Sequence, residues 1–308
     1  MENYDFKQIK YESFLINLGN HCIFALIALI AIGSATRVME AGLACPDWPL
    51  CYGSFLPLSK MNTQVFLEWF HRLDAFLVGL LITAQFSLSI IWRKYLPNWL
   101  PKIYSVLVFL IILQGSLGAF TVIKLLDSIT VISHLFIAFL ILITSISITQ
   151  NLHFKSTLKQ PKWWKMILFC PLLLTIIQSI IGARLSSTWS AHLCLAFDQS
   201  CLILNTHKLF AIPLTLSIIS ILIASFHNKT LFIKNWRYLI SLPFILLGQI
   251  TLGIFSLKTN LDQPFIIVFH QIFSSLLIST LAALFFREPI SEVIFESTNK
   301  KITLGYNS

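Results

Sequence analysis

Long runs of apolar, almost uncharged residues dominate this chain, and each is close to the roughly 20 residues that an α-helix needs to cross a bilayer. Because a backbone polar group cannot stay unpaired in lipid, each run must be a helix. An outer-membrane barrel is excluded, since its strands alternate polar and apolar residues over about 10 positions. The sequence therefore predicts an all-α, polytopic membrane protein with eight spans, at residues 18–36, 67–92, 103–123, 128–150, 164–184, 203–226, 237–257 and 264–286.

Composition supports the same class. Of 308 residues, 56% are hydrophobic and 11% are charged, against roughly 25% charged in an average soluble domain. So little polar surface excludes an ordinary cytosolic enzyme, a disordered protein and a disulfide-rich secreted module. The net charge of +9 does not indicate a nucleic-acid partner, because no basic run or recognition motif accompanies it. The expected surroundings are the lipid bilayer.

The positive charges predict an orientation. If the spans alternate, 15 of the 22 lysines and arginines lie on one side of the membrane and 7 on the other. The positive-inside rule then places both termini in the cytoplasm and the loops after the first and fifth spans outside. The acidic N-terminus, with Glu2, Asp5 and Glu12, does not resemble a transit peptide, and no cleavable signal precedes the first span. We expect a bacterial-type plasma membrane.

The second half of the chain repeats the spacing of the first. Twelve residues separate Gly33 from Cys45, and twelve separate Gly182 from Cys194. A glutamine and a glycine precede a histidine by 20 and 16 residues in one half and by 21 and 17 in the other: Gln114, Gly118 and His134; Gln249, Gly253 and His270. This repeat predicts two four-helix bundles, residues 1–160 and 161–308. Both bundles have the same orientation because four spans separate them.

Four histidines begin the second, fourth, sixth and eighth spans, where a polar side chain is costly and marks a functional candidate: His71, His134, His207 and His270. The four helices run in one direction, so the imidazoles reach a common depth. Two imidazoles facing each other in a four-helix bundle make an axial-ligand pair for haem iron. Zinc would need further ligands, and no carboxylate or thiolate recurs at this depth in both halves. The alternative is that these histidines only cap helix ends at the interface.

One carboxylate breaks the symmetry. Glu68 lies three residues before His71, whereas the matching position in the second half is Leu204. This difference predicts that one half holds a permanent haem while the other performs chemistry, for which Glu68 could accept a proton or steady a cation. The alternative is a helix-start acid that the helix dipole favours. Arg72 and Lys208 each follow a histidine and could pair with haem propionates, or simply reach to the interface.

The cysteines form two pairs in the loops expected outside, where disulfides persist. We predict the bridges Cys45–Cys51 and Cys194–Cys201, as loop staples or with one of them redox-active. The aromatic, proline-containing first loop suits a lid over a haem face. Cys22 and Cys170 lie in spans and are expected to be core thiols.

At this point the residues resemble a known family. The stretch from Gly42 to Cys51, GLACPDWPLC, followed by Glu68-x-x-His71-Arg72, is similar to haem A synthase. The resemblance covers nearly the whole chain. The second half matches more loosely, because the segment from Cys194 to Cys201 lacks the prolines of the first loop, and Lys208 stands where an arginine is common.

The resemblance implies an enzyme that oxidises the C8 methyl of haem O to a formyl group, giving haem A for terminal oxidases. It implies that His207 and His270 hold a resident haem B, and that His71 and His134 address the substrate haem O with Glu68 beside it. Water would supply the oxygen to a cationic intermediate. The expected partner is the haem O synthase, protohaem farnesyltransferase. The sequence does not identify the electron acceptor. A homo-oligomer is also possible on the sequence alone.

Other functions fit less well. A diheme b-type electron-transfer protein would need the same four histidines, but not an acid in one half only. A transporter predicts ionisable residues near the midplane, and the deepest acid, Asp74, is only about one turn below His71. A disulfide exchanger would show a C-x-x-C motif. These differences favour the haem-modifying oxidoreductase.

Overall fold

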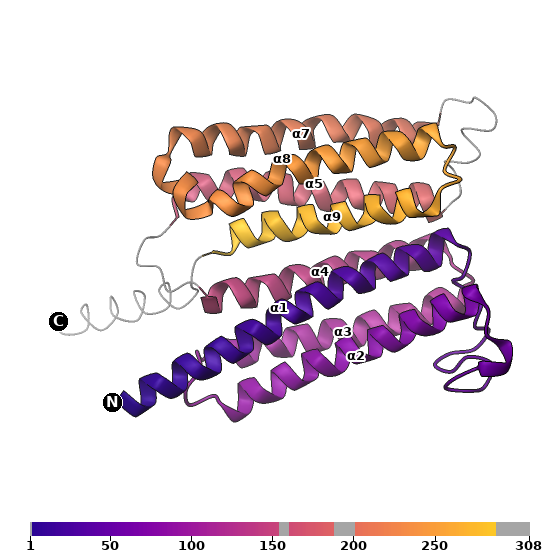
Figure 1. Cartoon of the computed structure of the whole chain (residues 1–308), viewed down its shortest axis with the longest axis horizontal. Coiled ribbons are helices and arrows are strands. Elements are labelled where there is room, and N and C mark those ends of the chain that lie inside the picture. The colour runs from indigo at the N-terminus through magenta and orange to yellow at the C-terminus, as the bar shows by residue number, and fades with distance from the viewer. Residues whose placement is uncertain (1, 154–159, 188–200, 288–308) are drawn as a thin grey trace, which may run out of the picture.

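The computed structural model describes residues 2–153, 160–187 and 201–287, and over these residues the chain is helical with no β-sheet. Eight of its helices are long and apolar enough to cross a membrane, so the expected multi-pass, all-α architecture is confirmed. Figure 1 shows them as two groups lying side by side. The first group contains α1 (Glu2–Val38), α2 (Thr63–Ile91), α3 (Leu100–Ile123) and α4 (Ser128–His153), and the second contains α5 (Lys162–Ser187), α7 (Leu202–His227), α8 (Lys229–Lys258) and α9 (Pro264–Phe285).

Several helices extend beyond the expected spans. The first helix begins at Glu2, well before residue 18, and α8 begins at Lys229, before residue 237. Hydropathy locates only the part of a helix that lies in lipid. The hydrogen-bonded helix extends further, to the residues that cap its ends. Asn62 and Asn228 are such caps, since their side chains accept hydrogen bonds from the backbone N–H groups of Val65 (2.9 Å) and Leu231 (3.1 Å).

The two groups share a detail of local structure. The turns that join α3 to α4 and α8 to α9 each hold two successive non-glycine residues with positive φ: Leu125 (50°) and Leu126 (62°), Asn260 (52°) and Leu261 (64°). The backbone N–H of the second residue bonds to a carbonyl five positions earlier in both turns, at 2.8 and 2.9 Å. The internal repeat seen in the sequence is therefore also a repeat of backbone conformation.

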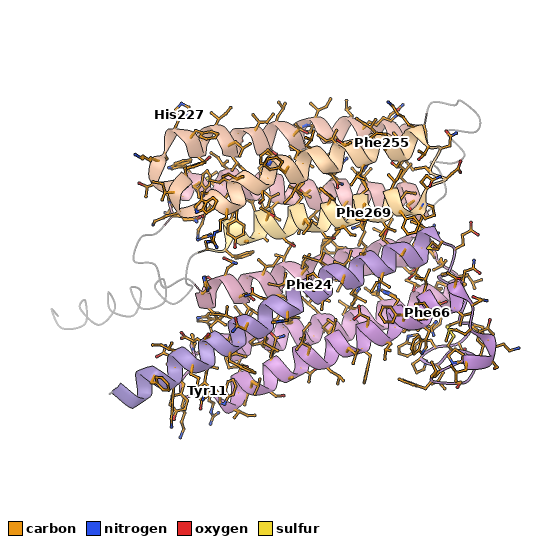
Figure 2. The ribbon with its side chains drawn as sticks, viewed as in Figure 1. Tyr11, Phe24, Phe66, His227, Phe255 and Phe269 are labelled. Atoms are coloured by element: carbon orange, nitrogen blue, oxygen red, sulfur yellow. A yellow bond between two sulfur atoms is a disulfide. The ribbon has the colours of Figure 1, made fainter. Side chains whose placement is uncertain are left out.

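The two groups meet where α1 contacts α9 and where α4 contacts both α5 and α9. Small polar side chains are buried on α4 and α9, among them Ser145, Thr149 and Ser275, as is usual where membrane helices approach closely. Large apolar side chains cover the outer surfaces of both groups, including the labelled Phe24 and Phe255 in Figure 2. In a membrane these side chains face lipid.

The two cysteines within spans differ in environment. Cys22 is buried, as expected, whereas Cys170 is exposed on α5. The expectation of a core thiol was wrong for Cys170, because membership of a span does not decide which face of the helix a residue occupies. In a membrane protein an exposed apolar side chain contacts lipid at no hydrophobic cost.

Candidate functional site

Each of the four membrane histidines rests against a glycine of the preceding helix. A β-carbon added to these glycines would lie 3.0 to 3.3 Å from the imidazole Cε1, closer than ordinary van der Waals contact: Gly33 against His71 (3.0 Å), Gly118 against His134 (3.3 Å), Gly182 against His207 (3.0 Å) and Gly253 against His270 (3.1 Å). Only glycine therefore leaves room for the ring as it lies. We call these four contacts the glycine seats.

The seats were missed by the sequence reasoning, although all four glycines were visible in the repeat. The signal was their fixed distance from other repeated residues, such as the spacing of Gly118 before His134 and of Gly253 before His270. By itself, that spacing indicates only a duplication. The structure shows that the repeated unit is a glycine and a histidine on successive helices.

The structure brings His207 of α7 and His270 of α9 together. Their ring centroids are 6.5 Å apart and their planes meet at 67°. Two imidazoles that bind one iron at about 2 Å each have centroids about 6 Å apart, so this spacing fits a shared iron. In the first half, His71 and His134 are seated on glycines in the same way.

Hydrogen bonding fixes the tautomer of His270. The Nδ1–H of His270 donates to the backbone carbonyl of Gln249 (3.0 Å), which leaves the Nε2 lone pair as an acceptor. Donation from the second ring nitrogen to a carbonyl is the usual arrangement behind a metal-binding imidazole. The side-chain amide of Gln249 donates to this Nε2 (3.2 Å), and Gln114 does the same to His134 (3.2 Å).

Three imidazole nitrogens have no partner. The Nδ1 atoms of His71, His134 and His207 are buried and make no hydrogen bond. An unpaired buried nitrogen is costly and calls for an explanation such as a missing ligand. Among the described residues, no three or more histidine, cysteine or acidic side chains come together to hold a metal ion. Paired imidazoles seated on glycines are an arrangement that a haem iron can use for its axial ligands.

Glu68 is buried on α2 and both of its oxygens are engaged. Oε2 accepts a hydrogen bond from the backbone N–H of Cys45 (2.7 Å), and Oε1 accepts one from Nη2 of Arg72 (2.5 Å). The carboxylate is therefore held toward the α1–α2 loop. Its counterpart in the second half, Leu204, is buried in a small apolar cluster with Leu185. The two halves thus differ here in polarity as well as in sequence.

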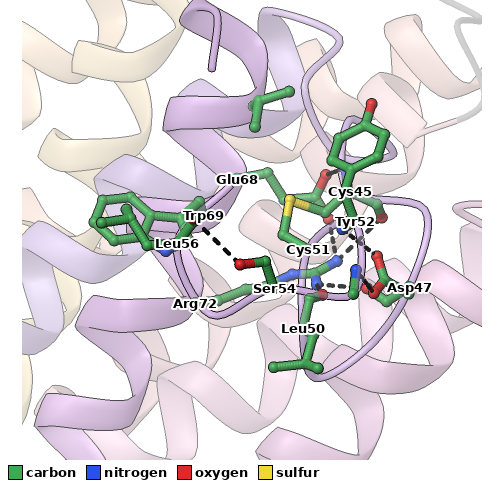
Figure 3. The surroundings of a disulfide bond; sticks show 12 residues. Cys45, Asp47, Leu50, Cys51, Tyr52, Ser54, Leu56, Glu68, Trp69 and Arg72 are labelled. Atoms are coloured by element: carbon green, nitrogen blue, oxygen red, sulfur yellow. Dashed lines mark hydrogen bonds and ion pairs between the residues drawn. A yellow bond between two sulfur atoms is a disulfide. The ribbon is translucent and has the colours of Figure 1, made fainter. Parts of the chain in front are cut away.

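Arg72 fastens the loop to α2, as Figure 3 shows. Besides the ion pair with Glu68, its guanidinium donates to the carbonyl oxygens of Asp47 (2.6 Å), Leu50 (2.6 Å) and Cys45 (3.3 Å). The sequence indicates Arg72 only as a propionate partner or an interfacial cation, and its role in holding the loop is visible only in the structure. A planar guanidinium with five N–H donors suits several carbonyls at once, which a lysine ammonium would satisfy less well. Lys208, at the matching position, is exposed.

The loop is closed by the expected disulfide. Cys45 and Cys51 are bonded with Cα atoms 4.8 Å apart, and both are buried. Cys201 is also disulfide-bonded, whereas Cys194, its expected partner, lies outside the described residues.

Within this loop, Asp47 accepts hydrogen bonds from the backbone N–H groups of Gly53 (2.7 Å) and Tyr52 (2.6 Å). Together with the nearby Arg72 charge, these bonds lower the pKa of Asp47 below its ordinary value. Its charged form therefore helps to hold the turn that follows Cys51.

Comparison with known proteins finds a matching family model and several similar proteins that share one name. A sequence model of the COX15-CtaA family, described as cytochrome oxidase assembly protein, matches residues 18–282. The Heme A synthase of Shewanella oneidensis is 35% identical over 131 residues, covering 37% of this chain and 38% of that protein. The Heme A synthase of Bradyrhizobium diazoefficiens is 28% identical over 195 residues, covering 52% of this chain and 54% of that protein.

A further similarity concerns another class of enzyme. The Protoheme IX farnesyltransferase of Haloarcula marismortui is 43% identical over 57 residues, which cover 18% of this chain and 12% of that protein. The matched stretches therefore span between 12% and 54% of the length of these three relatives.

Proposed function

Because the chain belongs to the COX15-CtaA family of cytochrome oxidase assembly proteins, the haem A synthase family, we propose that it oxidises the C8 methyl of haem O to the formyl group of haem A. The observation that carries this proposal is the combination of four glycine-seated histidines with one buried carboxylate, Glu68, in the first half only. A protein that only carries electrons has no need of that asymmetry.

In this proposal His207 and His270 hold a resident haem B, and His71 and His134 bind the substrate haem O. The spacing of His207 and His270 and the glycine seats of all four histidines support these roles. Bound haem iron supplies the redox chemistry that amino-acid side chains lack. The glutamine amides on His134 and His270 must leave Nε2 before that nitrogen can bind iron, so Gln114 and Gln249 would act as temporary partners of the rings.

Glu68 would serve the oxidation itself. Its place three residues before His71 on α2 puts a carboxylate beside the substrate half of the protein. There it would take the proton from the water whose oxygen enters the product, and its negative charge would stabilise positive charge that develops on the substrate during oxidation. The hydrogen bonds from Cys45 and Arg72 orient the carboxylate for this work.

The proposed setting is a bacterial-type plasma membrane with both termini in the cytoplasm. The haem O synthase is the proposed source of substrate, and the short similarity to a protoheme IX farnesyltransferase supports that link. The electrons must pass to an acceptor that this chain does not identify. Lys208 and Arg72 are proposed to face the haem propionates, which would require Arg72 to give up loop carbonyls.

The test is to co-express the chain with a haem O synthase and determine the mass of the extracted pigments. We expect haem A, and we expect haem B to remain with the purified protein. If haem O and haem B accumulate without haem A, the chain is better described by the second candidate, a diheme b-type electron-transfer protein, which the paired histidines also fit.

A further inference from the structure

The loop between α1 and α2 exposes large apolar side chains on the segment that follows the disulfide. Phe55 is 69% exposed, Leu58 73% and Leu56 42%, and Tyr52 is exposed beside them. We call residues 52–58 the apolar segment. A contiguous set of such side chains on a loop marks an interaction surface, because exposure to water would be unfavourable.

A hydrogen bond shows how deep this segment lies. The indole Nε1–H of Trp69 donates to the carbonyl oxygen of Phe55 (2.8 Å). The helix α2 has 29 residues and is therefore about 43 Å long, which exceeds the roughly 30 Å hydrocarbon core by about 13 Å. Trp69 lies about 9 Å from the start of α2, so an equal share of the excess at each end places it close to the edge of the hydrocarbon. The carbonyl of Phe55, which is bonded to that indole, therefore lies near the same edge.

The segment also lies beside the edge of the α2 face that is exposed to lipid. The Phe66 and Phe70 rings stack at 5.6 Å, and Trp69 lies 6.1 Å from Phe66. With 100° per residue, Phe66 and Phe70 share an exposed face of the helix with Leu77 and Leu80. Trp69 is half-buried at the edge of that face, where it packs against the disulfide.

The buried Glu68 lies on the opposite side of the helix from Phe66 and Phe70. The apolar segment thus continues the lipid-facing surface of a membrane helix toward the aqueous boundary. Aromatic side chains at that boundary are typical of membrane interfaces.

We infer that the apolar segment inserts into the interface of the phospholipid leaflet on its side of the membrane, and that lipid is the partner of this surface. The loop is then held from two directions, by lipid on one side and by the hydrogen bonds of Arg72 and Glu68 on the other. This inference does not depend on the haem chemistry proposed above. It assigns the exposed residues to the bilayer rather than to a protein partner or a second copy of the chain.

Photocrosslinking in the full-length protein tests this. We would replace Phe55 with p-benzoyl-phenylalanine, reconstitute the protein in phosphatidylethanolamine and phosphatidylglycerol nanodiscs, irradiate it and analyse adducts by mass spectrometry. Phe76, exposed on α2 within the span, is the reference for lipid contact, and the exposed, charged Lys60 of the same loop is the matched control. We expect phospholipid adducts at Phe55 at a yield within about threefold of Phe76 and well above Lys60.

A second site guards against a local disturbance. The same replacement at Leu58, which makes no side-chain hydrogen bond, is expected to give phospholipid adducts too. Retention of the Cys45–Cys51 bridge, seen as protection from alkylation, shows that the loop is still folded. Adducts only within the chain, or between two copies of it, overturn the inference. So do adducts with another protein when native membranes are irradiated.

Discussion

The backbone N–H of Cys45 donates a 2.7 Å hydrogen bond to Oε2 of Glu68. One cysteine of the loop disulfide is thus bonded to the carboxylate that has no counterpart in the second four-helix group. The residues are 23 positions apart, on the loop and on α2. Anything that reshapes the loop therefore also acts on the orientation of Glu68. This contact links the covalent closure of the loop to the proposed reaction site.

Glu68→Gln tests the role of the charge. The amide has nearly the same shape, but it cannot carry negative charge or take a proton, so haem A formation should fall about a hundredfold or more. Bound haem B should be retained. The measurement is haem A yield per folded protein, with haem B determined in the same sample. Leu204→Val at the matching position is the control and should change the yield little, because no charge is used there.

A normal yield from Glu68→Gln would show that Glu68 only anchors the loop. Loss of haem B together with haem A would contradict the assignment of the two haems to separate halves. Arg72→Lys would complement this test, since a lysine keeps the charge but cannot reach the same set of carbonyls.

Gly182→Ala tests the glycine seats. The added methyl would lie 3.0 Å from Cε1 of His207 and must displace the ring, so the resident haem should be lost or weakly held. Gly115→Ala is the matched control, because nothing lies within 4 Å of that position, and alanine favours a helix by up to about 1 kcal/mol. Haem per protein, from the pyridine haemochrome spectrum, decides between them. Equal haem content and identical spectra in both variants would show that the glycine seats are not needed for haem binding.

Cys51→Ser tests the loop staple. A bridge that closes so short a loop stabilises by about 2 kcal/mol through chain entropy, and its loss should expose the loop to proteolysis. Because the backbone N–H of Cys45 also orients Glu68, haem A formation should fall even in protein that remains folded. The control is Cys170→Ser, which removes an unpaired, exposed thiol and should leave both unchanged. Unaltered proteolysis of the loop in Cys51→Ser would contradict the prediction.

The pH dependence of the loop follows from Asp47. The pKa of Asp47 is lower in the folded protein, so its contribution to stability is complete above the ordinary aspartate pKa and is lost as pH falls through the folded value. Limited proteolysis between pH 7 and pH 2 should therefore show the loop protected at pH 5 and released only under strongly acidic conditions. Asp47→Asn lacks this titration and should be less protected at pH 7. Identical pH profiles for the two proteins would exclude Asp47 as the cause.

Much of the architecture could be predicted because lipid imposes a simple rule. Apolar length identified eight spans, and the repeat placed His71, His134, His207 and His270 at the starts of alternate helices. The Cys45–Cys51 bridge was also predictable, since both cysteines lie close together in one loop. These features depend on hydropathy and short spacing, which a sequence displays directly.

Other features depended on how the chain folds back on itself. The sequence showed Arg72 beside a histidine, but only the tertiary structure brings Asp47, Leu50 and Cys45, which lie 22 to 27 residues earlier, to its guanidinium. In the same way, the outward position of Cys170 depends on how α5 is rotated in the bundle. Bilayer energetics require only that a span be apolar and helical. Side-chain packing between neighbouring helices decides its rotation, and with it which glycine meets which histidine.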